Sequence, residues 1–295
     1  MSNIIYRAAR EEELAETLDL FLEAVNHLYR QHNLEMTLPP RAAVEVAYRH
    51  IFKTGIFRVA ETDGRLIAVC HAIVRDALWF LSGFWARPEL AARGVGGRLL
   101  REVWREGELL GARKFFVWSS MDQTAIASYL KAGMLPGYQV FTFTGQPAAL
   151  RDLPRAPTGY TVEPLSLEVA CGIDREVRET RREVDHRFWL SEVKLEGRQV
   201  RRGGRLVGYY YFKGDAFGPA AWMETEVAEA LLTLGCREAA AQSETLSLRV
   251  PGINHDAIRF ALKHGLRLSG ATAHLFTNAP IGRMEQYLAS GPSLF

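Results

Sequence analysis

Cysteine is scarce in this sequence of 295 residues, where Cys70, Cys171 and Cys236 are spread along the chain. Three thiols so far apart predict neither a disulfide framework nor a cysteine-based metal site. We therefore expect a protein of a reducing compartment that carries no metal.

Long hydrophobic runs are also absent. No apolar run approaches the roughly 20 residues that a membrane-spanning helix needs. The residues MSNIIYR lead directly into acidic residues, unlike a secretory signal peptide. We expect a cytoplasmic protein with no membrane partner.

The sequence also lacks an excess of charge of one sign, since it has 36 Lys and Arg residues and 34 Asp and Glu residues, for a net charge of +2. The basic residues are scattered, so we expect no nucleic-acid partner. A hydrophobic content of 48% and a charged content of 24% are typical of a soluble globular protein with a real core. The length favours two domains, or one large domain.

A glycine-rich turn at Gly94–Gly97 follows an apolar strand that runs to about Ala86 and a break at Pro88. The helix that begins there carries apolar residues at one-face spacing. Free N–H groups at a helix start, with glycines that let a ligand approach, form an anion site. A P-loop is excluded because Gly-Lys-Ser/Thr is absent, and the dinucleotide fingerprint fails because Leu99 stands at its third glycine.

The first half of the chain alternates strands and helices like a complete α/β domain. Asp63-Gly64 predicts a hairpin turn. The expected strands are at 4–8, 57–61, 65–74, 77–86, 114–119 and 139–144; the expected helices are one of about twenty residues from Glu11, then 41–53, one from the glycine turn to about 110, and 122–132.

Two motifs in this order resemble those of the GNAT N-acetyltransferase superfamily. The family's pyrophosphate motif, Gln/Arg-x-x-Gly-x-Gly/Ala, is similar to AARGVG at 91–96. Its later helix motif, Asn-x-x-Ala-x-x-x-Tyr-x-Lys-x-Gly-Phe, is similar to DQTAIASYLKAGM at 122–134. Ala91 and Asp122 depart from the usual residues.

The resemblance implies an α/β (α+β) fold class with two tandem GNAT-like domains, each a mixed, mostly antiparallel twisted sheet flanked by helices. It also implies acetyl-CoA as co-substrate, bound at the glycine turn and along the strand before it. The cofactor-binding residues expected on this basis are Phe84, Trp85, Ala86, Arg93, Gly94, Val95, Gly96, Gly97, Arg98, Leu99, Asp122 and Ala125.

The resemblance implies a general acid but leaves the general base open. Tyr129 resembles the family's general acid, and a phenol near pKa 10 is reasonably matched to a thiolate near 8.5. The carboxylate that the family often uses as base is missing from 77–86. His71 is the preferred alternative because of its ordinary pKa, followed by Asp76, Ser119 and Asp122. Proton transfer through a chain of water molecules, or an amine that arrives already neutral, is also open.

The second half repeats the first in outline. Residues 254–266 (NHDAIRFALKHGL) lie over 122–134, but Ala261 stands in place of Tyr129, and FGPAAWMETE at 217–226 replaces the glycine turn. The stretch 182–196 is expected to be irregular. We predict a catalytic domain at 1–146, a linker at 147–158 and a degenerate GNAT-like domain at 159–295.

The resulting hypothesis is an N-acetyltransferase that acts on a small-molecule amine or a peptide amino group, as a monomer or homodimer. A non-catalytic acyl-CoA sensor and a purely structural module are the alternatives. Residues that could line the acceptor pocket are Tyr29, His32, Trp79 and Trp118.

Overall fold

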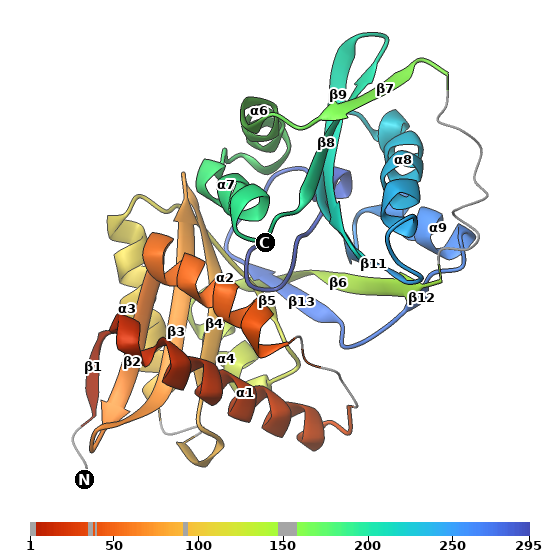
Figure 1. The fold of residues 1–295 in the computed structure, drawn as a ribbon. Coiled ribbons are helices and arrows are strands. Elements are labelled where there is room, and N and C mark those ends of the chain that lie inside the picture. The colour runs from red at the N-terminus through yellow and green to blue at the C-terminus, as the bar shows by residue number, and fades with distance from the viewer. Residues whose placement is uncertain (1–3, 35–37, 39, 91–93, 147–157) are drawn as a thin grey trace. The chain divides into compact units, whose positions relative to one another are not determined.

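The computed structural model describes residues 4–34, 38, 40–90, 94–146 and 158–295 (Figure 1). The chain forms two compact units. Unit 1 contains Met1–Gly137, His274–Ala279 and Pro292–Leu294, and unit 2 contains Tyr138–Ala273, Pro280–Gly291 and Phe295. The predicted linker at 147–158 lies almost wholly outside the described residues.

The sheet of unit 1 has the strand order β1-β2-β3-β4-β5-β13. All neighbours are antiparallel except β4 and β5, which are parallel. The strands are β1 (Ile5–Ala8), β2 (Ile56–Thr62), β3 (Arg65–Arg75), β4 (Leu78–Ala86), β5 (Lys114–Ser119) and β13 (Ala273–Thr277).

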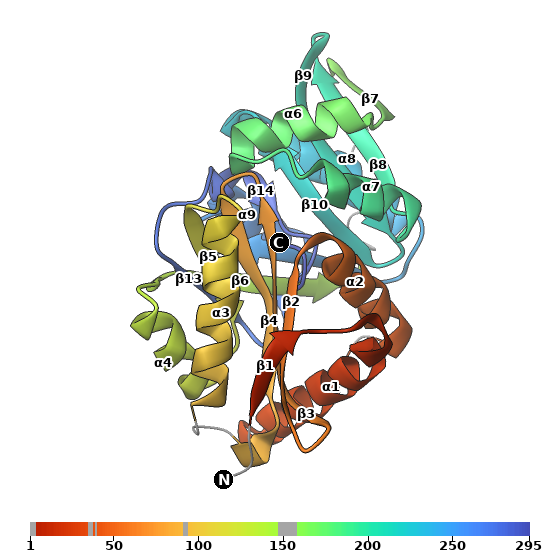
Figure 2. The same cartoon turned by 90° about the vertical axis from the view of Figure 1, so that its left-hand side faces the viewer.

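Helices cover both faces of this sheet (Figure 2). Helices α1 (Leu14–Gln31) and α2 (Arg41–Thr54) lie on one face, and α3 (Val95–Leu109) on the other. Helix α4 (Gln123–Lys131) packs on the α3 side through Tyr129. The expected apolar stripe of α3, including Leu99 and Val103, is buried, which is why this helix docks on the sheet.

The sheet of unit 2 repeats this plan in the order β7-β8-β9-β10-β11-β6, again with one parallel pair, β10 and β11. Two short strands are added, β12 on β6 and β14 on β10. The strands are β6 (Leu135–Gly145), β7 (Tyr160–Pro164), β8 (Glu196–Arg202), β9 (Arg205–Lys213), β10 (Ala216–Trp222), β11 (Leu246–Pro251), β12 (Arg267–Leu268) and β14 (Tyr287–Leu288).

Unit 2 also has helices on both faces of its sheet (Figure 1). Helices α6 (Leu167–Arg178) and α7 (Glu183–Ser191) lie on one face, and α8 (Ala228–Ala240) and α9 (His255–Lys263) on the other. The predicted fold class, a mixed and mostly antiparallel sheet flanked by helices in each of two GNAT-like halves, is confirmed.

The last strand of each sheet comes from the other half of the sequence. Strand β6 follows α4 directly but pairs with β11 of unit 2, in register from Leu246↔Gly145 to Pro251↔Val140. Strand β13 follows the helices of unit 2 but pairs with β5 of unit 1. Local sequence pattern carries no information on this exchange.

One expected feature is wrong. The stretch 182–196 was expected to be irregular but contains helix α7. Its buried residues are Asp185, His186, Phe188 and Trp189, so two of the four are polar. A polar buried face masks the hydrophobic period by which a helix is predicted.

Candidate functional site

Strand β4 parts from β5 half-way along its length. The two strands pair only from Leu78↔Lys114 to Leu81↔Val117. On the other side, β4 pairs with β3 as His71↔Gly83 and Ala72↔Leu81, so Ser82 is an extra, bulged residue. A bulge bends a strand and ends its pairing. Among the described residues no strand pairs with β4 at 82–86 on the β5 side, which leaves backbone groups there for a ligand.

The amino end of α3 presents backbone N–H groups. Gly94 precedes the helix with a left-handed φ of 80° and no side-chain cap. The Arg98 N–H donates to the Gly94 carbonyl at 3.2 Å, and the N–H groups of Val95, Gly96 and Gly97 have no hydrogen-bond partner among the described residues, so these three suit an anion. Val95 and Leu99 bury their side chains in the core and offer only their backbone.

The ring of Phe84 joins β4 to both helices of this face. A Cβ at Gly96 would lie 2.8 Å from its Cζ, so only glycine fits without displacing the ring. The ring centroid lies 6.1 Å from that of Tyr129 on α4. The structure thus brings together three predicted residues that are far apart in the sequence.

Tyr129 is 4% exposed and packs between Phe84 and Phe276, whose ring centroid is 6.0 Å away. Its hydroxyl makes no hydrogen bond with the described residues. Burial raises its pKa, with smaller contributions from Cys70 and Asp122, so the phenol is protonated at neutral pH.

The other predicted residues of β4 alternate between the two faces. Ala86 packs with Phe84 against the core on the α3 face. The ring of Trp85 lies 5.1 Å from Phe21 of α1, on the opposite face. Only the backbone of Trp85 is therefore placed beside the α3 amino end.

Asp122 is the N-cap of α4. Its Oδ1 accepts hydrogen bonds from the N–H groups of Thr124, at 2.7 Å, and Ala125, at 3.0 Å. This carboxylate satisfies helix-end donors, as an N-cap does. Ala125 is partly buried against the core.

The two predicted arginines differ in what can be said of them. The exposed Arg98 guanidinium lies 4.1 Å from the Tyr6 ring centroid and donates to Glu102 Oε1 at 3.3 Å. These contacts hold it along the helix. Arg93 lies outside the described residues, as does Ala91.

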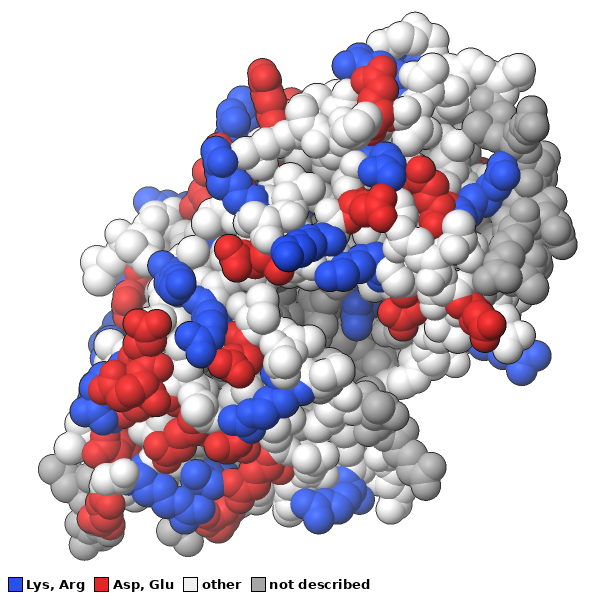
Figure 3. Space-filling view, in the orientation of Figure 1, with Lys and Arg blue, Asp and Glu red and all other residues white. Residues whose placement is uncertain are grey.

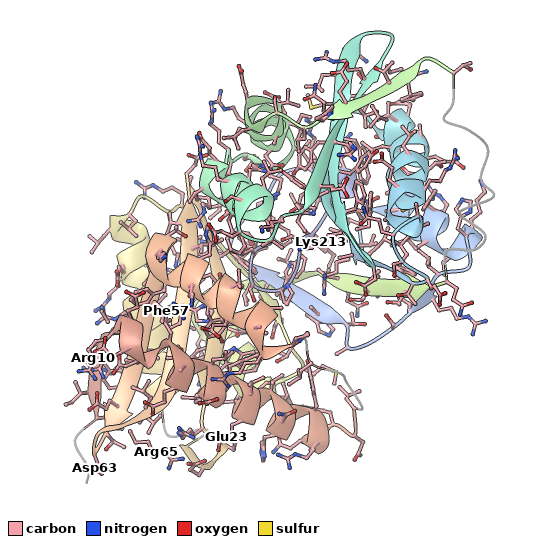
Figure 4. All side chains as sticks on the ribbon, in the orientation of Figure 1. Arg10, Glu23, Phe57, Asp63, Arg65 and Lys213 are labelled. Carbon is pink, nitrogen blue, oxygen red and sulfur yellow. The ribbon has the colours of Figure 1, made fainter. Side chains whose placement is uncertain are left out.

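His71 is fully buried on the α1/α2 face, and neither ring nitrogen has a hydrogen-bond partner. It stacks on Phe57, labelled in Figure 4, with centroids 4.6 Å apart, and meets the edge of Tyr48 at 4.8 Å. A Cβ at Gly83 would overlap its ring. Burial lowers the pKa of His71 to about 3, so the imidazole is neutral at neutral pH and a weak base.

The remaining base and acceptor candidates have other contacts. Ser119 donates to the Ser120 carbonyl at 2.7 Å. Trp79 is fully buried in the core beneath α3, against Trp104 and Phe115, so it lines no pocket on the α1/α2 face. The Tyr48 hydroxyl, which the sequence did not single out, is buried without a hydrogen-bond partner.

A protein-family model, the acetyltransferase (GNAT) family, matches residues 21–134. Residues 21–134, which are fewer than half of the chain, are therefore similar to the GNAT family. This range contains β4, the α3 amino end and Tyr129.

Solved GNAT structures have the same fold over almost the whole chain. A Pyrococcus horikoshii protein assigned as an acetyltransferase is 13% identical, with a TM-score of 0.78 over 100% of this chain and 97% of its own. A tandem GNAT protein from the clavulanic acid biosynthesis pathway is 14% identical, with a TM-score of 0.60 over 95% and 99%. A GCN5-related N-acetyltransferase from Sphaerobacter thermophilus is 15% identical, with a TM-score of 0.61 over 93% and 95%. At these identities the likeness shows the fold alone. No curated protein matches the sequence significantly.

In unit 2 the features described for unit 1 are changed. Asn254 caps α9 by accepting from the Ala257 N–H at 3.0 Å, as Asp122 caps α4, but the buried Ala261 replaces Tyr129. The start of α8 has no glycine turn; it is preceded by the single turn Thr225–Val227 and by Glu224, which pairs with Arg205.

Three findings concern other partners. No helix in the described part of the chain is long and apolar enough to cross a membrane. The described ranges also contain no group of three or more His, Cys, Asp or Glu side chains suited to a metal ion. Lys and Arg are interspersed with Asp and Glu over the face shown in Figure 3.

Proposed function

We propose that this protein is an N-acetyltransferase that moves an acetyl group from acetyl-CoA to a primary amine on a small molecule or peptide. We assign catalysis to residues 1–146, with 147–158 as linker and 159–295 as the degenerate domain. The observation that carries the proposal is the contact of Phe84 with Gly96 and Tyr129 beside the open edge of β4.

The free N–H groups of Val95, Gly96 and Gly97 suit the pyrophosphate, because a helix amino end attracts anions. The open edge of β4 beyond Leu81 suits the pantetheine arm, which carries amide groups that hydrogen-bond like a strand.

Acetyl-CoA, when bound, supplies an acetyl group activated as a thioester. Holding it beside the amine contributes on the order of 7–11 kcal/mol in favourable cases, so few side chains are required. Tyr129 donates its proton to the sulfur as the C–S bond breaks and the amine forms the C–N bond. The proton that the amine loses passes to water, because the buried His71 is too weak a base to take it, and the Tyr129 phenol is restored from solvent.

Titration calorimetry with acetyl-CoA tests the first step. We expect one saturable binding event, and no heat of binding at millimolar coenzyme would overturn the proposal. A mass-spectrometric screen of amines incubated with protein and acetyl-CoA tests the second step. An acetylated amine is expected; tight binding with no product across the library would instead indicate an acyl-CoA sensor.

A further inference from the structure

Strand β10 of unit 2 repeats the departure of β4 from its parallel neighbour. It pairs with β11 only at Ala216↔Ser247 and Phe217↔Leu248. Its register with β9 then shifts between Phe217 and Ala220. A gap therefore opens between β10 and β11 at the position where β4 leaves β5 in unit 1.

In unit 2 this gap is filled by the chain itself. Residues Tyr287–Ala289, which we name the strap, pair with β10 as Ala220↔Leu288 and Ala221↔Tyr287. On its other side the strap bridges to β11, where the Ala289 N–H donates to the Arg249 carbonyl at 3.1 Å. All three strap residues are at most 1% exposed.

The strap fits closely and is held along its length. A Cβ at Gly218 would lie 2.8 Å from the Ala289 carbonyl oxygen, so β10 leaves no space beside it. Asn254 Nδ2 donates to the Tyr287 carbonyl at 3.0 Å, and Arg249 donates to the Ser290 carbonyl at 3.1 Å.

A buried ionic cluster anchors the Tyr287 side chain. Arg182 donates to the Tyr287 hydroxyl at 3.0 Å and forms an ion pair with Asp174. The Arg178 guanidinium lies 4.6 Å from the Tyr287 ring centroid. Burial opposes the ionisation of Asp174, but Arg182 and His186 hold its pKa below the usual range, so it stays charged.

We propose that the strap takes, in unit 2, the place that the pantetheine arm takes in unit 1, so that unit 2 is closed to the coenzyme and each chain binds one. This inference rests on the proposed function of unit 1. An extended peptide and the pantetheine arm present the same chemistry, amide groups spaced along a chain, to a strand edge. Asn254, the N-cap residue of α9, donates to a backbone amide carbonyl of the strap, whereas Asp122 at the matching N-cap of α4 can only accept.

Hydrogen-exchange mass spectrometry of the full chain, with and without saturating acetyl-CoA, tests the proposal. We expect peptides that cover 285–290 to be protected in the free protein and unchanged by acetyl-CoA. Peptides that cover 82–86 should exchange at least about tenfold more slowly once the coenzyme is bound. Calorimetry on the same sample should give one coenzyme per chain. Two coenzymes per chain, or loss of protection at 285–290 on binding, would overturn the proposal that the strap closes unit 2 to the coenzyme.

Asn254→Asp separates the strap contact from the helix cap. The carboxylate still accepts from Ala257 but cannot donate to Tyr287. We expect about tenfold faster exchange at 285–290, the order for loss of one buried hydrogen bond, with α9 still protected. Asp122→Asn is the matched change in unit 1 and should leave 285–290 unaltered. Tyr287→Phe, which removes only the hydroxyl bound to Arg182, should act in the same direction as Asn254→Asp.

The two proposals fail separately. If acetyl-CoA binds nowhere, the proposed function falls, and the strap is judged on the free protein and on Asn254→Asp. Protection at 285–290 that the variant weakens supports occupancy of the gap. Rapid exchange there in the unaltered protein contradicts it.

Discussion

The sheets of units 1 and 2 share one strand plan and one parallel pair, but they differ in what lies where that pair diverges. In unit 1 no described strand covers β4 beyond Leu81 on its β5 side. In unit 2 the strap pairs with β10 beyond Phe217 and buries its backbone groups. Under the proposed function, this difference means that unit 2 closes its ligand slot by pairing its backbone edge, without a change of fold.

The fully buried histidines of the two units, His71 and His186, differ in their hydrogen bonds. His71 of unit 1 has no hydrogen-bond partner at either ring nitrogen. His186 of unit 2 has two, Tyr211 at 2.9 Å and Asp174 at 3.0 Å. Buried polar atoms without partners are costly, and they are tolerated where function requires them. The fully buried histidine thus lacks partners in unit 1 and belongs to a hydrogen-bonded network in unit 2, although unit 2 also contains buried atoms without partners, such as Arg178 Nε and Trp222 Nε1.

The largest effect is expected from breaking the buried network of Asp174, Arg182 and His186 in unit 2. Asp174→Asn removes the buried charge that balances Arg182 and should lower the free energy of unfolding by about 3–5 kcal/mol. Chemical denaturation of the variant and the unaltered protein measures this difference in the free energy of unfolding. Glu176→Gln, an exposed change on the same helix, should stay within about 0.5 kcal/mol. Equal effects of the two changes would mean that the network does not hold unit 2 together.

The second-largest effect is expected on turnover, from removal of the Tyr129 hydroxyl, which has no counterpart at Ala261 in unit 2. Tyr129→Phe keeps the ring contacts with Phe84 and Phe276 but removes the proposed acid, so kcat should fall about 100- to 1000-fold. The Kd for acetyl-CoA, measured by calorimetry on the same variant, should change little. An unaltered kcat would place the acid elsewhere.

The glycine turn, which unit 2 lacks, is tested by a matched pair of substitutions. Gly96→Glu forces a side chain against Phe84 and adds negative charge beside the pyrophosphate, so acetyl-CoA affinity should fall about 100-fold. Gly97→Ala meets nothing closer than Arg101 Nη1 at 3.7 Å and should change the affinity by less than about twofold. Comparable losses in both variants would contradict the role of Gly96.

The effect that is smallest at neutral pH, and that grows as the pH falls, concerns the unpartnered His71. Its pKa is about 3 in the folded protein against an ordinary value of 6.5, so between these values the unfolded chain binds a proton that the folded chain does not. Stability from this group is complete above pH 6.5 and is lost as the pH falls toward 3, by up to about 1.4 kcal/mol per pH unit. Denaturation of His71→Leu across this range should show a shallower decline than the unaltered protein. Parallel curves would mean that His71 takes up its proton without unfolding.

The sequence by itself predicted the elements whose signals are local. The Asp63-Gly64 turn, the apolar stripe of α3 and the two motifs at 91–96 and 122–134 each lie within a few consecutive residues. The expected strand at 114–119 agrees with β5 residue for residue, because an apolar run between a glycine and polar residues has few alternatives. The expected cofactor and catalytic residues stay predictions, although Gly96 and Tyr129 prove to share a neighbour in Phe84.

Only the tertiary structure decided which segments complete which sheet and what fills each gap. Residues distant in the sequence decide three features. These are the exchange of β6 and β13 between the sheets, the pairing of Tyr287–Ala289 with β10, and the lack of hydrogen-bond partners at His71. Helix α7 was missed because its buried Asp185 and His186 break the apolar period. Hydrophobic spacing shows which face of an element is buried. It does not show which strands pair, because strand pairing uses backbone N–H and C=O groups that almost every residue has.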